Sequence, residues 1–211
     1  MAGGIFNPEN GIFRYTEKMA DFVILSVFWL VCSLPLFTFG PATAALYHTV
    51  VRCLRGNERN SWGVFFRTFR SNFRVGAPAG LIALGIGAVL VWIQGAIYQW
   101  VAPPVGTVLY AAYWVLLLLP VGAGCYLFPV LSRFTFELKG LFSNCARLAA
   151  AHLPSTVLLA QILFFAVTLC AYVPLGLVVM PVVKAWLHYL LLERVFRPYL
   201  PQQTQEEDGQ A

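Results

Sequence analysis

The sequence predicts an all-α membrane protein, a polytopic helix bundle of about five transmembrane helices with amphipathic cytoplasmic helices between them. Residues 75–132 contain no Asp, Glu, Lys or Arg. A helix needs about 20 apolar residues to cross a hydrocarbon core of about 30 Å, so this run holds two crossings. The composition agrees, because 11% of the residues are charged, 59% are hydrophobic and the mean hydropathy is +0.72. A soluble domain has roughly 25% charged residues.

Three long uncharged runs hold the expected spans, and turn residues divide two of them. The Pro-Pro-Val-Gly stretch at 103–106 combines prolines, which lack a backbone donor, with a flexible glycine, and it predicts a turn between two antiparallel helices. The run over 148–183 is too long for one helix, and Pro174 and Pro181 interrupt it. The expected elements are spans at about 22–40, 77–101, 106–132, 154–172 and 175–192 within one membrane domain at 1–200, and a disordered tail at 201–211.

The basic residues predict the orientation, because short cytoplasmic loops of membrane proteins are rich in Lys and Arg. The segment after the first expected span contains six arginines and one acidic residue, Glu58. The segment after the third span is also basic. We therefore expect both segments and the C-terminus in the cytoplasm, with the N-terminus and the turn at 102–106 outside. A four-span alternative, with one helix over 153–183, would export the basic residues that follow it, and the charge bias disfavours it.

The six arginines form two sets with the same spacing of i, i+3, i+7, which places each set along one helical face. In the second set, phenylalanines repeat this spacing one residue earlier. This pattern predicts an interfacial amphipathic helix from about Ser61 to Phe73, with Ser61 as its N-cap. The arginines are candidates for binding lipid headgroups or a partner, and arginines that only fix the topology by snorkelling would show the same pattern. The sets are Arg52, Arg55 and Arg59, and Arg67, Arg70 and Arg74.

A polar pair at membrane depth is the second candidate site. Lys184 and His188 are one helical turn apart in the last expected span. Lys184 lies about eight residues, or roughly 12 Å at helical rise, from the cytoplasmic end. Its ammonium group either snorkels to the surface or lines an internal polar cavity with His188, with Gln94 or Gln161 as further candidates. Such a cavity would favour an anionic ligand.

Other motifs that carry chemistry are missing from the sequence. There is no Walker-type glycine loop, no H-E-x-x-H and no Ser, His and Asp set that the expected topology could bring together, so we expect no catalytic, cofactor or metal site. The five cysteines show no C-x-x-C spacing and are expected to act as small apolar fillers. The net charge of +5 is explained by the cytoplasmic loops, so a nucleic-acid partner is not expected.

Three stretches of the sequence resemble the YesL family of small bacterial membrane proteins. They are Gly-Ile-Phe at 11–13, Leu-Pro-Leu-Phe-Thr-Phe-Gly-Pro-Ala-Thr-Ala-Ala-Leu-Tyr at 34–47, and Phe-Phe-Arg-Thr-Phe-Arg-Ser-Asn-Phe at 65–73. The family is a domain of unknown function whose members are commonly encoded beside carbohydrate ABC importers and their regulators in Gram-positive bacteria. The resemblance therefore implies an accessory role in sugar uptake, and it supplies no catalytic residues.

We accordingly expect a non-enzymatic, multi-pass protein of the bacterial cell membrane that serves as an accessory or assembly component of carbohydrate ABC-type uptake. Its expected partners are the lipid bilayer and the importer's permease subunits. The alternative is a small carrier or channel for an anionic or sugar solute, which Lys184 and His188 favour together with a possible internal repeat of span, amphipathic helix and span. A lipid-binding scaffold that uses only the amphipathic helices is a third possibility.

Overall fold

The computed structural model describes residues 11–56, 60–134, 136–173 and 176–196. These residues form helices and short connections with no strand, which confirms the all-α class. The elements in chain order are α1 (Gly11–Ser33), the 3₁₀ turn η1 (Leu36–Thr38), α2 (Phe39–Gly56), α3 (Ser61–Ser71), α4 (Phe73–Trp100), α5 (Val105–Arg133), α6 (Leu138–Ala151), α7 (Leu153–Tyr172) and α8 (Gly176–Phe196).

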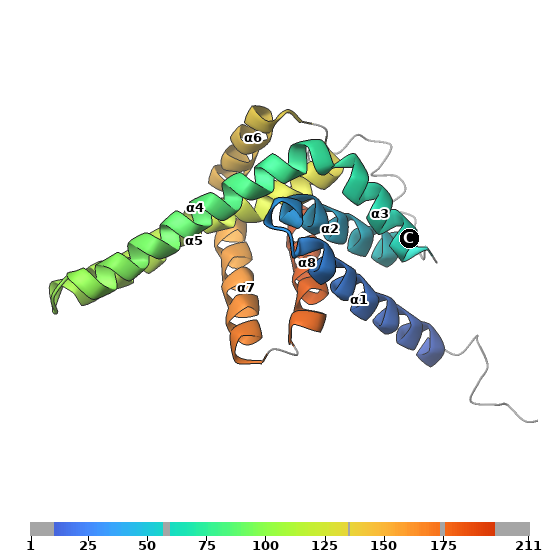
Figure 1. Cartoon of the computed structure of the whole chain (residues 1–211), viewed down its shortest axis with the longest axis horizontal. Helices are drawn as coiled ribbons and strands as arrows, with labels where there is room; N and C mark the ends of the chain where they lie inside the picture. Colours follow the sequence, from blue (N-terminus) through green and yellow to red (C-terminus); the bar gives the residue numbers. More distant parts are fainter. Residues whose placement is uncertain (1–10, 57–59, 135, 174–175, 197–211) are drawn as a thin grey trace, which may run out of the picture.

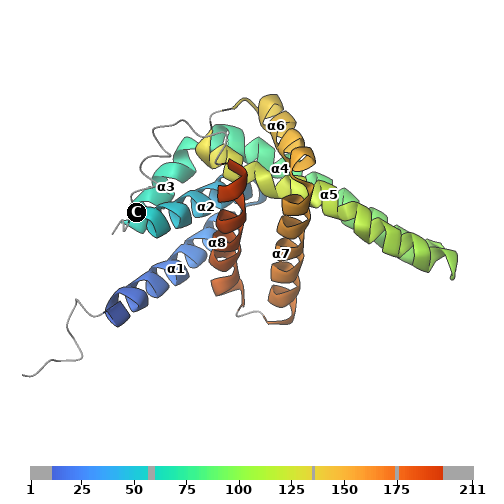
Figure 2. The ribbon, with the colours of Figure 1, turned by 180° about the vertical axis from the view of Figure 1, so that it is seen from behind.

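The helices form a fan with three arms (Figure 1). One arm is the antiparallel hairpin of α4 and α5, the second is the hairpin of α7 and α8, and the third is α1. The arms extend from the side of the molecule that holds α2, α3 and α6, which we call the basal layer. The view from behind shows the same arrangement (Figure 2). The turn between α4 and α5, the end of α7, the beginning of α8 and the beginning of α1 point away from the basal layer.

Four helices in the described part of the chain are long and apolar enough to cross a membrane, namely α4, α5, α7 and the first part of α8, Gly176–Glu193. Each begins and ends within four residues of an expected span. The protein is therefore an all-α membrane helix bundle. The last helix continues past its expected end, because Val195 and Phe196 are buried in its final turn. The predicted disordered tail at 201–211 lies outside the described residues.

The expected first span over 22–40 is wrong as a single helix. The first helix, α1, ends at Ser33, because a proline two residues later lacks a backbone donor and disfavours helix in the residue before it. The Thr38 hydroxyl donates hydrogen bonds to two carbonyls at this break, those of Cys32 (2.5 Å) and Pro35 (2.6 Å). The apolar part of α1, Asp21–Ser33, is shorter than the roughly 20 residues of a full crossing.

The second difference from expectation is α2, which is a buried central helix and not a surface segment. All side chains from Ala42 to Tyr47 are buried, and α2 packs against α1, α3, α4, α5 and α8. Glycines permit its close approach to α4. A Cβ added to Gly40 would clash with the backbone oxygen of Gly76, and one added to Gly80 would lie 2.7 Å from Gly40 Cα. The Gly-x-x-x-Gly spacing of α4 is typical of closely packed membrane helices.

The possible internal repeat is reproduced only in part. A short helix precedes a span twice, as α3 before α4 and as α6 before α7. The buried helix α2 has no counterpart, because α5 ends at Arg133 and α6 begins at Leu138. The two halves of the chain therefore share the order of a short helix and a span. They differ because only the first half contains a buried helix, α2, before the short helix.

Candidate functional site

The predicted amphipathic helix is present as α3, and its first turn fixes it to two other helices. Its N-cap is Asn60, whose side chain accepts a hydrogen bond from the Gly63 backbone N–H (3.2 Å), so the predicted cap at Ser61 is one residue too late. Ser61 is buried instead. Its hydroxyl donates to Asp21 Oδ2 of α1 (3.3 Å) and lies 3.2 Å from Cys53 Sγ of α2. This contact ties α3 to α1 and α2.

Three faces run along α3, and their order follows from about 100° of rotation per residue. The buried face contains Phe65 and Thr68. Phe65 is fully buried, and its ring centroid lies 6.3 Å from that of Phe28 in α1. The next face is aromatic and the third is basic, so the aromatic face lies between the protein and the arginines. The helix is therefore held by one face and offers the other two to its surroundings.

The aromatic face continues beyond α3 as a strip of neighbouring rings. Phe69 and Phe73 have ring centroids 5.8 Å apart, and Phe73 lies 6.4 Å from Phe37 of η1. Trp62 and Phe66 are exposed at the other end. The aromatic strip, as we call it, consists of Trp62, Phe66, Phe69, Phe73 and Phe37. It joins α3 to the exposed break between α1 and α2.

The second arginine set lies on the basic face beside this strip. Arg67 and Arg70 on α3 and Arg74 in the first turn of α4 are all exposed, and we call the three the α3 arginines. Of the first set, Arg52 is exposed near the end of α2, whereas the Arg55 side chain and all of Arg59 lie outside what the structure describes. The helical face that the first set is predicted to share therefore stays a prediction.

Lys184 and His188 come together with a cysteine from another helix. His188 is buried, interacts with the backbone of Leu159 in α7, and has no hydrogen-bond partner for Nε2 in the described part of the chain. The Cys125 thiol of α5 points toward the same Leu159 carbonyl oxygen, 3.8 Å away. Lys184 lies close enough to Cys125 and His188 to interact with both electrostatically. We call Cys125, Lys184 and His188 the inner polar cluster.

The inner polar cluster lies at the depth that the sequence predicts for Lys184. Cys125 precedes Arg133, the last residue of α5, by eight residues, or about 12 Å at helical rise. The two glutamines proposed as further members do not join the cluster. Gln161 is exposed on α7, and Gln94 lies in the outer part of α4, an arm that projects away from α8. Cys125 was not predicted, because a single cysteine in an apolar span has the same pattern as a packing residue.

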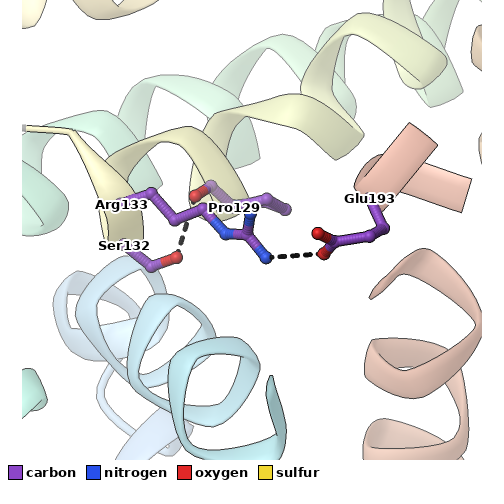
Figure 3. Close-up of polar contacts among 4 residues, drawn as sticks. All are labelled: Pro129, Ser132, Arg133 and Glu193. Atoms are coloured by element: carbon purple, nitrogen blue, oxygen red, sulfur yellow. Dashed lines mark hydrogen bonds and ion pairs between the residues drawn. The ribbon is translucent and has the colours of Figure 1, made fainter. Parts of the chain in front are cut away.

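An ion pair joins the last residue of α5 to the final part of α8 (Figure 3). Arg133 Nη2 of α5 lies 3.2 Å from Glu193 Oε2 of α8, and the side chains are 11% and 25% exposed. The guanidinium group also lies 5.3 Å from the centroid of the Phe196 ring. In the turn before it, the Ser132 hydroxyl donates to the Pro129 carbonyl oxygen. Glu193 therefore bonds to Arg133, and no described carboxylate forms an ion pair with Lys184.

The cysteines outside the inner polar cluster show no feature of a reactive thiol or of a disulfide. All five cysteines are free thiols, and Cys53, Cys125 and Cys145 are buried. Burial raises the pKa of Cys145 in α6 to about 12, so this thiol stays protonated at neutral pH and is a poor nucleophile. Its packing in the core beside Leu141 and Ala149 agrees with the predicted role of a small apolar filler.

Comparisons with known proteins point to one family. The family model described as "Protein of unknown function, DUF624" matches residues 22–93. The uncharacterized protein YesL of Bacillus subtilis (strain 168) is 28% identical to this chain over 160 residues, which cover 74% of this chain and 75% of that protein. The resemblance to the YesL family is confirmed. No solved structure matches. The family model covers α2, α3 and most of α4, including the α3 arginines, and it leaves the inner polar cluster outside.

Proposed function

We propose that this YesL-like chain is a non-enzymatic accessory or assembly component of carbohydrate ABC-type uptake in the bacterial cell membrane. The observation that carries the proposal is the projecting hairpin of α4 and α5. The buried residues of α4 are Gly76, Ala79 and Gly80, all at its base, so no residue from 81 to 100 is buried. An apolar helix of this length that its own chain leaves uncovered offers a long surface within the membrane to another membrane helix.

One face of the arm suits such a partner. Gly85, Val89 and Trp92 are exposed and follow one another at i, i+4 and i+7, so they lie along one side of α4. Nothing lies within 4 Å of a Cβ added to Gly85. A small residue beside a large aromatic one allows a partner helix to approach closely and to pack against the ring. We assign this face to a membrane helix of an importer permease subunit, because the YesL family implies that partner.

Affinity purification of the tagged chain in mild detergent tests the proposal. We expect a carbohydrate importer permease to co-purify with the wild type, and the recovered permease to fall about tenfold in a Gly85→Leu and Trp92→Ala double variant, because the contact surface is disrupted. The control is Phe165→Ala, which removes an equally exposed aromatic ring from α7 and should retain the permease. Recovery of no permease, or only of a second copy of this chain, would contradict the proposed partner.

The orientation is a further part of the proposal. We expect Glu58→Cys and Gln205→Cys to react with a membrane-impermeant thiol reagent only after cells are opened, because the arginine-rich segments belong in the cytoplasm. Pro104→Cys and a cysteine at the N-terminus should react in intact cells. Reaction of Glu58→Cys in intact cells would refute the orientation. An N-terminus found in the cytoplasm would show that α1 does not cross and that α1 and α2 form a re-entrant hairpin.

A small carrier or channel for an anionic or sugar solute is the second candidate. The inner polar cluster favours it, since an ammonium group at membrane depth that forms no ion pair with a described carboxylate can bind an anion within the bundle. The two candidates use different parts of the molecule, the α4 arm and the interface of α5, α7 and α8. Substitutions in only one of these two parts therefore distinguish the accessory function from the carrier function.

A further inference from the structure

We propose that the α3 arginines and the aromatic strip form a binding surface for anionic phospholipid headgroups, a role separate from partner docking through the α4 arm. The surface combines three exposed guanidinium groups with an adjacent row of rings, of which Phe69 is half-buried and the other four are exposed. The surface lies mainly on α3, with Phe73 and Arg74 from the first turn of α4 and Phe37 from η1. The buried face of α3 is fixed to the rest of the protein through Phe65 and Ser61.

The position of the surface relative to the membrane follows from the chain itself. Phe73, at the end of the strip, is the first residue of the spanning helix α4. Phe37, its neighbour in η1, is exposed together with Leu34 and Leu36. The strip therefore begins where a membrane span begins, at the boundary between headgroups and acyl chains. Rings placed there bury their apolar surface in lipid, as interfacial amphipathic helices do.

The charge on the neighbouring basic face has no counterpart among the described residues. Helix α3 contains no acidic residue, and no described carboxylate forms an ion pair with Arg67, Arg70 or Arg74. Arg67 and Arg70 lie one helical turn apart on α3 and Arg74 lies in the first turn of α4, so separate headgroups can reach them. Guanidinium groups bind phosphate oxygens through paired N–H donors, which favours a phosphodiester over a zwitterionic surface.

An acidic protein is a poorer match than an anionic lipid. The basic face is about a quarter turn from the aromatic strip, so a partner would have to offer acidic and apolar groups side by side at the membrane boundary. An anionic phospholipid offers both in one molecule, a phosphate group and acyl chains. Three arginines at such a surface should favour anionic over zwitterionic lipid by on the order of 100-fold.

The test uses the full chain in nanodiscs made of phosphatidylcholine with or without phosphatidylglycerol. We expect native mass spectrometry to detect phosphatidylglycerol retained by the wild type, and this retention to fall by at least tenfold in Arg67→Gln with Arg70→Gln. The matched control is Lys139→Gln with Arg147→Gln, which removes the same charge from exposed positions on α6 and should keep retention unchanged. Equal loss in both variants would show a general charge effect and overturn the proposal.

A second measurement distinguishes headgroup binding from other sources of the same chemistry. A spin label at Phe66→Cys should be shielded from a water-soluble relaxation agent in discs that contain phosphatidylglycerol, because the strip is inserted. Full water exposure of the label would refute the surface assignment. Release of the retained lipid by millimolar inorganic phosphate would identify a free-phosphate site instead. Retention of an acidic protein by the wild type, with no lipid preference, would assign the arginines to a protein partner.

Discussion

Gly80→Val should prevent stable folding of this protein, whereas Gly85→Val, five residues later in the same helix, should be tolerated. The two substitutions change helix propensity equally, so propensity does not account for the expected difference. A Cβ at position 80 would lie 2.7 Å from both the N and Cα atoms of Gly40, while nothing lies within 4 Å of one at position 85. Because the obstacle is backbone, α4 and α2 would have to separate.

The expected loss of stability in Gly80→Val is large because α2 packs against five other helices at the centre of the molecule. Overpacking a core typically costs about 1–3 kcal/mol, and here it would also open the contacts between α2 and the start of α4. We expect Gly80→Val to be recovered as aggregate or to unfold at least 10 °C below the wild type in mild detergent, and Gly85→Val to elute and unfold as the wild type does. Similar unfolding temperatures for the two variants would show that the crossing of α2 and α4 is looser than described.

The spans were predictable because lipid imposes a length that can be counted. Charged residues are excluded from the run over 75–132, and a single turn motif divides it, so the hairpin of α4 and α5 follows from the sequence alone. The prediction of the first span was wrong, because its uncharged run does not coincide with one helix. Its uncharged run does not end at the helix end, and Pro35 breaks the helix inside the run.

The central, buried position of α2 could not be predicted, because many of its buried residues are small. Residues 40–45, Gly-Pro-Ala-Thr-Ala-Ala, have weak hydrophobic signals, and Arg52 follows shortly after them. Small side chains at a membrane-helix crossing serve close approach, and their value depends on a partner helix elsewhere in the chain. The YesL-like stretch at 34–47 includes this segment, which is consistent with a resemblance centred on the packing core.

One candidate site could be predicted from helical spacing, and the other could be predicted only in part. The α3 arginines and all of their aromatic neighbours except Phe37 lie within residues 62–74, on α3 and the start of α4, so helical spacing in the sequence placed them together. The buried role of Phe65 required the contact with α1. The inner polar cluster joins α5, α7 and α8, and helical spacing could relate only Lys184 to His188. Cys125 joined them through tertiary packing that no local pattern encodes.

We expect Lys184→Leu and His188→Leu each to raise the unfolding temperature in detergent, by several degrees, and to leave co-purification of a permease unchanged. A charged ammonium group at membrane depth costs about 2–3 kcal/mol, and no described carboxylate compensates it. The buried Nε2 of His188 has no described hydrogen-bond partner, and such a group costs about 1–3 kcal/mol. Leucine removes both costs. In a protein of this size, 1 kcal/mol corresponds to about 2–4 °C.

The same variants decide between the two candidate functions, because a cluster built for a ligand sacrifices stability for binding. Trp186→Leu is the control, since this exposed side chain lies between the two residues in sequence and on a different face of α8. If Lys184→Leu and His188→Leu fold normally and abolish growth that depends on solute uptake, while Trp186→Leu grows normally, the inner polar cluster is a binding site and the carrier function takes precedence. Normal growth of both variants, with higher stability, supports the accessory function and assigns the cluster to packing.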